Sequence, residues 1–165
     1  MEPERCADPS LLFTEEAFRV YAPCMYRPTY EAYGAKMGLY ASDPSVRIFI
    51  CRGEGKTAGM LVLKRAGRDA EIVGIAAAEE LRRRGIGRSM LRRAAEAEGL
   101  RSLTAQTDDE AVGFYRRCGF TAERTVVRYP DGDAVRYRCV WERRTAERNG
   151  SEGEQTDETE TVQEL

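Results

Sequence analysis

The segment at residues 82–88 (RRRGIGR) combines arginines with closely spaced glycines, a pattern that can bind phosphate groups. Glycines at positions 85 and 87 let the backbone curl so that several N–H groups converge. Ile86 and Met90 lie at helical spacing, so a helix is expected to begin here and to add its positive dipole end. The arginines supply further positive charge. The segment therefore predicts a diphosphate-binding corner, although the glycine spacing alone favours an ordinary helix start with a solvated basic face.

Two common phosphate-binding motifs do not fit this segment. A dinucleotide-binding fingerprint needs a third glycine, which does not follow at the required place. It also needs parallel flanking strands, whereas the strands expected before residue 82 form an antiparallel meander. A P-loop needs a Gly-Lys-Ser/Thr sequence, which is missing here.

The sequence contains no histidine, and this limits the available chemistry. A Ser-His-Asp triad, a histidine-based metal site and imidazole acid–base catalysis are all excluded. Proton transfer must use Glu, Asp, Tyr, Cys, Lys or bound water. The five cysteines are scattered and form no C-x-x-C pair. Reduced thiols in a cytoplasmic protein are therefore expected, with neither disulfides nor a metal site.

Length and charge predict one domain followed by a tail. Residues 1–144 are expected to form a single domain, and residues 145–165 an acidic, disordered tail. The tail carries seven acidic residues and one arginine, a net charge of −6 within a chain of net charge −2. No apolar run approaches the roughly 20 residues of a membrane helix. The polar N-terminus MEPERCADPS is unlike a secretory signal.

Two helices are expected ahead of the sheet. Thr14 and the two glutamates after it predict a helix N-terminus, with Pro23 kinking or ending the helix over residues 14–27. Residues 29–41 predict a second helix, because tyrosines and a methionine recur at helical spacing. Residues 11–13 could form a short first strand.

An antiparallel meander and a helix should follow. Apolar runs separated by the turn sequences GEGK and AGRD predict the meander. Gly74, inside the last of these runs, is typical of a bulge or of a close approach by another backbone or a ligand. A polar loop then leads into an amphipathic helix that ends at Gly99. The strands are expected at residues 46–51, 57–64 and 71–77, the loop at residues 78–84 and the helix at residues 85–98.

The remaining pattern completes a mixed fold. Asp108 or Asp109 can cap a short helix, and the turn sequence PDGD joins the two strands of a final hairpin. A helix between two strands implies a right-handed crossover and a parallel pair, whereas the meander and the hairpin are antiparallel. The sequence therefore predicts an α+β fold with a mixed, mostly antiparallel sheet and helices on its faces. This part comprises a strand at residues 100–107, a helix at residues 110–118 and strands at residues 121–129 and 134–141.

Two segments in this order resemble the signatures of the Gcn5-related N-acetyltransferases, the GNAT family. In EIVGIAAAEELRRRGIGRSMLRRAAEAEG, a strand precedes a long helix, and Arg82, Gly85 and Gly87 match the family pattern [QR]-x-x-G-x-[GA]. In DDEAVGFYRRCGF, five residues match the second signature, N-x-x-A-x-x-F-Y-x-x-x-G-F, with Asp in place of the usual Asn. The resemblance implies a three-layer α/β/α fold whose sheet is splayed at the fourth family strand, residues 71–77. The five matches are Ala111, Phe114, Tyr115, Gly119 and Phe120.

The resemblance also implies a site for acetyl-CoA as acyl-donor cosubstrate, without a metal. The pantetheine arm would lie along residues 71–77, bonded by backbone groups of Ile75 and Ala77, and the diphosphate would bind N–H groups of residues 83–88. A backbone N–H of Ile75 or Ala76 would stabilise the developing oxyanion. The residues implied in cofactor binding are Ile75, Ala76, Ala77, Arg82, Arg83, Arg84, Gly85, Ile86, Gly87, Arg88 and Asp108.

Two side chains are candidates for the proton transfers of an N-acetyltransferase. Glu71 matches the position of the catalytic glutamate in histone-type family members and could deprotonate the amine, a role that bound water can also fill. The alternative for Glu71 is a surface charge at the start of a strand. Tyr115 matches the tyrosine that donates a proton to the CoA thiolate. Its alternative is an amphipathic packing residue.

The sequence does not identify the acceptor amine, and it allows other classes of function. A small-molecule amine, a lysine side chain and a peptide N-terminus all fit, and the first two helices and the last hairpin would wall the acceptor pocket. The candidate wall residues are Tyr26, Tyr30, Tyr33 and Tyr129. A CoA-binding module without activity is the main alternative. A nucleic-acid partner is disfavoured, because the chain is net acidic and no aromatic residue interrupts the arginine cluster. The sequence indicates no membrane partner and does not choose between a monomer and a homodimer.

Overall fold

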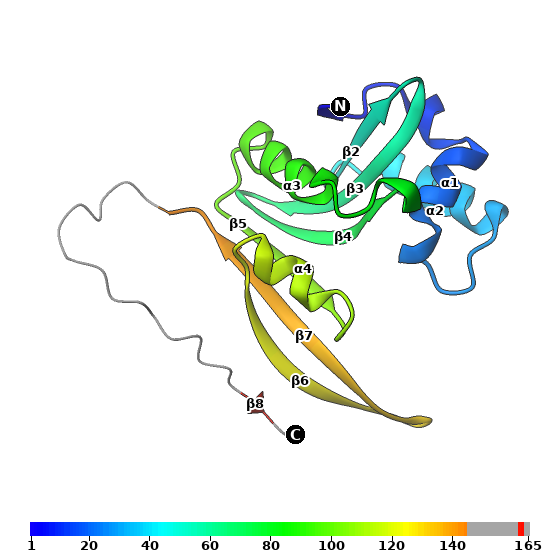
Figure 1. The fold of residues 1–165 in the computed structure, drawn as a ribbon. Helices are drawn as coiled ribbons and strands as arrows, with labels where there is room; N and C mark the ends of the chain where they lie inside the picture. The colour runs from blue at the N-terminus through cyan, green and yellow to red at the C-terminus, as the bar shows by residue number, and fades with distance from the viewer. Residues whose placement is uncertain (145–161, 164–165) are drawn as a thin grey trace. The chain divides into compact units, whose positions relative to one another are not determined.

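The computed structural model describes residues 1–144 and 162–163 (Figure 1). The chain divides into two compact units, Met1–Leu100 and Arg101–Leu165. The acidic tail expected at residues 145–165 lies outside the described residues, apart from Val162 and Gln163. Among the described residues, every helix falls short of the length and apolarity that a membrane span requires.

The first unit is built on an antiparallel meander of strands. Strand β2 pairs with β3, and β3 pairs with β4, through the two turns that the sequence predicts. A short strand, β1, pairs with the outer edge of β2. The strands are β1 (Pro3–Arg5), β2 (Val46–Gly53), β3 (Lys56–Ala66) and β4 (Asp69–Ala77).

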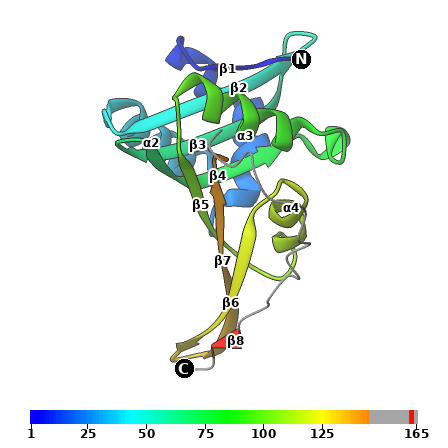
Figure 2. The same cartoon turned by 90° about the vertical axis from the view of Figure 1, so that its left-hand side faces the viewer.

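Helices cover both faces of this meander (Figures 1 and 2). Helices α1 (Glu15–Tyr21) and α2 (Tyr30–Ser42) lie on one face, and a 3-10 turn, η2 (Ala22–Cys24), follows α1 directly. Helix α3 (Ile86–Ala97) lies on the other face and follows a 3-10 turn, η3 (Glu79–Leu81). Each face therefore has its own apolar core.

The core on the α1–α2 face contains most of the buried aromatic rings of the first unit. Tyr21 and Tyr33 are almost fully buried there, with ring centroids 6.2 Å apart. Alternate strand residues such as Ile48 and Val62 point into the same core. On the opposite face, α3 contributes a stripe of five buried residues, Ile86, Met90, Leu91, Ala94 and Ala95. The amphipathic pattern predicted for residues 85–98 is thus confirmed.

A buried glutamate joins the C-terminal end of α3 to the sheet. The side chain of Glu98 is only 6% exposed, and its carboxylate contacts guanidinium groups from three strands. Arg65 donates from 2.6 Å, Arg47 from 3.3 Å, and Arg5 lies 3.8 Å away. A buried carboxylate is costly to leave unpaired, so these contacts fix where α3 ends on the sheet.

The second unit contains a long hairpin and a short helix. Strand β7 pairs antiparallel with both β5 and β6, and β8 pairs parallel with β6. The elements are β5 (Ser102–Thr107), α4 (Val112–Arg117), β6 (Thr121–Tyr129), β7 (Gly132–Glu142) and β8 (Val162–Gln163).

The predicted mixed fold is confirmed, with differences at three short segments. Residues 11–13 do not form a strand, because Pro9 and the Asp8 cap start the 3-10 turn η1 (Pro9–Leu12). Strand β1 was not predicted, since three residues hold no periodicity and are ordered only by pairing with β2. Helix α4 begins at Val112 rather than at residue 110, because Asp108 first closes a turn over residues 110 and 111.

Candidate functional site

Strand β4 contains a bulge near its middle, as Gly74 led us to expect. Val62 pairs with Gly74, whereas the next residue of β3, Leu63, pairs with Ile72. Val73 is therefore an extra residue on β4 and is partly exposed. The bulge shifts the pairing of all later β4 residues with β3 by one residue.

After the bulge, the backbone of β4 presents two residues away from β3. The amide of Ala78 donates to the carbonyl of Ala58 on the β3 side at 2.8 Å. Because the direction of backbone groups alternates along a strand, Ala76 also faces β3, whereas Ile75 and Ala77 face the opposite edge. The carbonyl of Ile75 accepts a hydrogen bond from the Cys24 thiol on that edge, at 3.3 Å. Thus the backbone groups of Ile75 and Ala77 point away from β3.

The chain then turns into α3 through left-handed backbone. Arg83 has φ +64° and Gly85, the N-cap of α3, has φ +79°. The first backbone bond of the helix runs from the Ser89 amide to the Gly85 carbonyl. No side chain caps this helix, so the amides of its first turn have no acceptor from the helix itself or from the N-cap residue. The first-turn amides and the positive dipole end of α3 are therefore the donors that this corner could offer to an anion.

A glycine on β3 places the corner close to the β4 edge. A Cβ at Gly59 would lie 2.8 Å from Ile86 and 2.9 Å from Met90, so α3 packs directly on the strand backbone there. Gly59 in turn pairs with Ala77 of β4. The start of α3 thus packs on the β3 residue that pairs with Ala77, at the end of β4.

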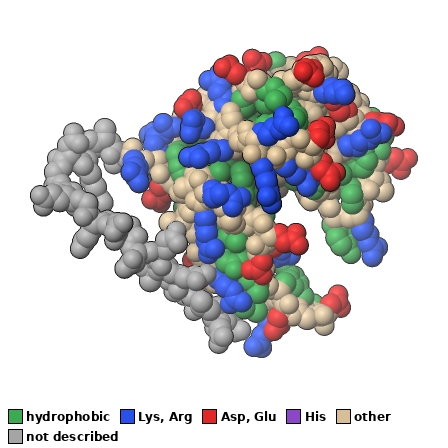
Figure 3. Space-filling view, viewed as in Figure 1, with side chains coloured by type: hydrophobic (Ala, Val, Ile, Leu, Met, Phe, Trp, Pro, Cys, Tyr) green, Lys and Arg blue, Asp and Glu red, His purple; other side chains and the backbone are tan. Residues whose placement is uncertain are grey.

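The corner is open and basic. Arg82, Arg83, Arg84 and Arg88 are all exposed, and Gly85 faces open space, since a Cβ there would contact nothing within 4 Å. Figure 3 shows Lys and Arg side chains gathered over the region of α3. A doubly charged diphosphate would find backbone donors at the corner and guanidinium groups around it.

The candidate base lies on the same strand, before the bulge. Glu71 is exposed and pairs across the sheet with Lys64. Lys64 also pairs with Val46, which points into the α1–α2 core, so Glu71 lies on the α1–α2 face of β4. Glu79 and Glu80 are exposed in η3, as expected of loop charges.

The other two predicted site residues belong to the second unit. Tyr115 in α4 is 6% exposed, and its ring contacts Phe114 and Phe120 at centroid distances of 5.1 and 5.3 Å. The Asp108 carboxylate accepts from the amides of residues 110 and 111, both at 3.1 Å. Asp108 thus closes the turn before α4, which is the capping role that the sequence allowed.

The four tyrosines predicted to wall the acceptor pocket differ in solvent exposure. Tyr33 is fully buried and its hydroxyl donates to the Leu12 carbonyl, so it packs in the core and cannot contact an acceptor. Tyr26, Tyr30 and Tyr129 are exposed, and the Tyr30 hydroxyl donates to the Phe13 carbonyl at 3.1 Å. Three of the four tyrosines therefore remain available to a ligand.

Two residues against β4 were not singled out from the sequence. Tyr21 is 1% exposed, and its hydroxyl would overlap a Cβ placed at Gly74. Cys24 donates to the carbonyl of Ile75. Burial and the neighbouring Cys24 raise the pKa of Tyr21, and loss of hydration raises the pKa of the Cys24 thiol to about 11. The only sequence signal for these contacts is the three-residue spacing of Tyr21 and Cys24, which allows both side chains to face one strand.

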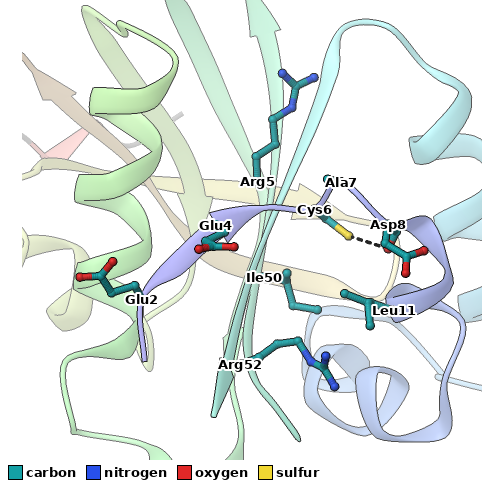
Figure 4. A pocket seen from close by; sticks show the side chains of 9 residues that line it. All are labelled: Glu2, Glu4, Arg5, Cys6, Ala7, Asp8, Leu11, Ile50 and Arg52. Carbon is teal, nitrogen blue, oxygen red and sulfur yellow. Dashed lines mark hydrogen bonds between the residues drawn. The ribbon is translucent and has the colours of Figure 1, made fainter. Parts of the chain in front are cut away.

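A separate hollow of about 450 Å³ lies beside β1 (Figure 4). Cys6, Asp8 and Arg52 are among its lining residues, and the Cys6 thiol donates to the Asp8 carbonyl at 3.2 Å. Strands β1 and β4 are the two outer strands of the first unit's meander. This hollow is therefore distinct from the corner and the β4 edge.

Comparison with known proteins identifies a family signature over this region. Residues 44–122 match a family model described as "Acetyltransferase (GNAT) domain". No curated protein matches the chain in sequence.

Solved structures share the fold at low sequence identity. A ribosomal-protein-alanine N-acetyltransferase from Escherichia coli has a TM-score of 0.64 at 17% identity, covering 90% of this chain and 97% of its own. A spermidine N-acetyltransferase from Vibrio cholerae has a TM-score of 0.60 at 20% identity, covering 86% and 95%. A streptothricin acetyltransferase homologue from Bacillus anthracis, solved with acetyl-CoA, has a TM-score of 0.57 at 21% identity, covering 65% and 68%. The TM-scores show a shared fold, and at these identities the likeness extends to the fold alone.

Proposed function

We propose that this chain, which belongs to the Gcn5-related N-acetyltransferase (GNAT) family, transfers an acetyl group from acetyl-CoA to a primary amine. The observation that carries the proposal is the uncapped start of α3, which packs on Gly59 of β3, the residue that pairs with Ala77 of β4. The corner offers donors to a diphosphate, and the edge offers the amides of Ile75 and Ala77 and the Ala77 carbonyl to a pantetheine arm, while the Ile75 carbonyl accepts from Cys24. A cosubstrate with both parts in sequence is a coenzyme A thioester.

In this proposal the chain's residues bind and orient the donor. The amides of residues 83–88, with the arginines around them, hold the diphosphate, and Ile75 and Ala77 hold the pantetheine amides. The Ile75 or Ala76 amide stabilises the negative charge that develops on the thioester carbonyl oxygen. The alternation along β4 favours Ile75 for this role, since Ala76 faces β3.

The chemical step is direct attack by the amine. An alkylammonium ion, with an ordinary pKa of about 10.4, must lose a proton before its lone pair can attack. Glu71, directly or through water, accepts that proton. The amine nitrogen then bonds to the thioester carbon, the carbon–sulfur bond breaks to release CoA thiolate, and the nitrogen loses its second proton to solvent to give the neutral amide. Tyr115 donates a proton to that thiolate and is returned to its neutral form by solvent.

The acceptor is proposed at the level of chemical class. Related folds include proteins named for spermidine and for an alanine of a ribosomal protein. A primary amine on a small molecule, on a lysine or at a peptide N-terminus is common to all of these candidates. All five cysteines are free thiols, which suits the cytoplasmic location that we propose.

Release of CoA thiol tests this function. Purified protein is incubated with acetyl-CoA and panels of polyamines, amino acids, aminoglycosides and peptides, and free thiol is measured over time. We expect at least one amine to raise thiol release above the rate with acetyl-CoA alone. Gly87→Glu protein serves as the matched control and should be inactive. Tight acetyl-CoA binding without turnover on every panel would instead support a CoA-binding module without activity.

A further inference from the structure

The α1–η2 segment contacts β4 at the two residues where its backbone changes direction. Tyr21 and Cys24 are three residues apart, so both lie on the same side of the turn that continues α1. Tyr21 packs against Gly74, and Cys24 donates to the carbonyl of Ile75. A single turn of chain therefore contacts two consecutive residues of the bulged strand.

Tyr21 leaves no space at the bulge. An added Cβ at Gly74 would overlap the Tyr21 hydroxyl and would lie 2.7 Å from the ring carbon that carries it. The tyrosine is itself held in place, because it is almost fully buried and its ring packs against Tyr33. Gly74 thus cannot move toward the α1 face, and the extra residue, Val73, must remain the bulged one.

Cys24 contacts the next residue of β4 through its backbone edge, whereas Tyr21 contacts the face of the strand. Its thiol reaches the outward edge of β4, which carries the Ile75 and Ala77 backbone groups. A hydrogen bond to the Ile75 carbonyl fixes the tilt of the peptide that follows Ile75. The contact is thus made to the backbone, next to the amide that the donor thioester would use.

We propose that Tyr21 and Cys24 are positioning residues that hold the β4 bulge and thereby aim the Ile75 and Ala77 backbone groups at the acyl end of the donor. This inference rests on the proposed function. It assigns the acyl and pantetheine end of the site to the α1–η2 segment and the diphosphate end to the α3 corner. A substitution in one segment should therefore weaken binding at its own end of the site and leave binding at the other end unchanged.

The test compares two ligands on the same variants. Acetyl-CoA engages both ends, whereas 3′-phosphoadenosine 5′-diphosphate keeps the diphosphate and lacks the pantetheine arm. Equilibrium affinities are measured by titration calorimetry for the wild type, Cys24→Ala, Cys24→Ser and Tyr21→Phe. Cys6→Ala is the matched control, because its thiol also donates to a backbone carbonyl of the first unit but lies beside β1.

We expect Cys24→Ala and Tyr21→Phe to weaken acetyl-CoA binding by roughly 5- to 10-fold, as for the loss of one hydrogen bond. Affinity for the nucleotide should stay within about twofold of the wild type, within the error of such comparisons. Cys24→Ser keeps a donor and should recover most of the acetyl-CoA affinity. Cys6→Ala should change neither affinity.

Three results would overturn the inference in distinguishable ways. Unchanged acetyl-CoA affinity in both variants would show that the β4 edge does not depend on Tyr21 and Cys24. Equal losses for the two ligands would indicate a general effect on folding rather than positioning. If the wild type binds neither ligand, the proposed function itself fails, and this inference fails with it.

Discussion

The first turns of α1 and α3 differ in whether a side chain accepts from their backbone amides. Thr14 begins α1 with extended backbone, and its hydroxyl accepts from the Ala17 amide at 3.1 Å. Thr29 does the same for α2. Helix α3 begins instead at left-handed Gly85, with no side-chain acceptor and with arginines in place of acidic residues. A helix capped by its own threonine needs no ligand there, whereas the free donors and dipole of α3 are what we propose an anion binds.

The largest expected effect comes from placing an anion of the chain's own at this corner. Gly87→Glu adds a carboxylate and a side chain to the first turn of α3, where a diphosphate would bind. We expect acetyl-CoA affinity to fall by more than about 100-fold, since the carboxylate competes for the same donors and repels phosphate. Calorimetric titration measures the loss, and an unchanged affinity would remove the diphosphate from this corner.

Tyr115→Phe should separate binding from chemistry. The variant keeps the ring that packs against Phe114 and Phe120 and loses only the hydroxyl. If the hydroxyl protonates the leaving thiolate, turnover should fall by roughly 100-fold, a typical contribution of general acid catalysis. Acetyl-CoA affinity should remain nearly the same. Steady-state thiol release and titration measure the two quantities, and equal turnover in both proteins would exclude the acid role.

Removing a threonine cap should lower the stability of the fold and leave acetyl-CoA affinity unchanged. Thr14→Ala leaves the Ala17 amide without its acceptor, and the free energy of unfolding should fall by about 1 kcal/mol. Acetyl-CoA affinity should not change, because α1's first turn is not part of the corner. Urea unfolding and titration on the same preparation give both values. A loss of affinity without a loss of stability would contradict the contrast between the two helix starts.

The smallest expected effect concerns alkaline pH. The Cys24 pKa is raised from 9.0 to about 11 in the folded protein. Between these values the unfolded chain loses this proton while the folded chain keeps it, so the stability that Cys24 contributes is complete below pH 9 and falls as pH rises toward 11. Cys24→Ala should therefore lose slightly less stability than the wild type over this range. Parallel unfolding curves at pH 8.5 and about 10.5 test the difference, and a steeper loss in the variant would refute it.

The sequence predicted those features that depend on neighbouring residues. Thr14 and Thr29 mark helix starts because a cap acts over three residues, and Gly74 marks the bulge because a single glycine changes strand behaviour locally. The corner was predictable for the same reason, since Gly85 and the arginines beside it are consecutive. The resemblance to the family added roles for Ile75, Ala77 and Tyr115, and these roles stay predictions.

Features that depend on distant residues were not predictable from one sequence. Tyr21 contacts Gly74 and Cys24 contacts Ile75 across more than 50 positions, and no local pattern pairs them. The arginine contacts of Glu98 come from three strands, and β1 exists only because β2 offers an edge. Such pairings follow from tertiary packing, which local propensity does not encode.

Amide chemical shifts during a titration with CoA test the central claim most directly. In ¹⁵N–¹H correlation spectra, the amides of residues 85–88 at the start of α3 should shift strongly on adding CoA. The amides of Ala17 and Ala32, which are already bonded to threonine caps, should stay unchanged. Saturable shifts confined to the α3 corner and the β4 edge are the predicted result. Saturable binding that leaves the α3 amides unmoved would contradict the assignment of the diphosphate to this corner.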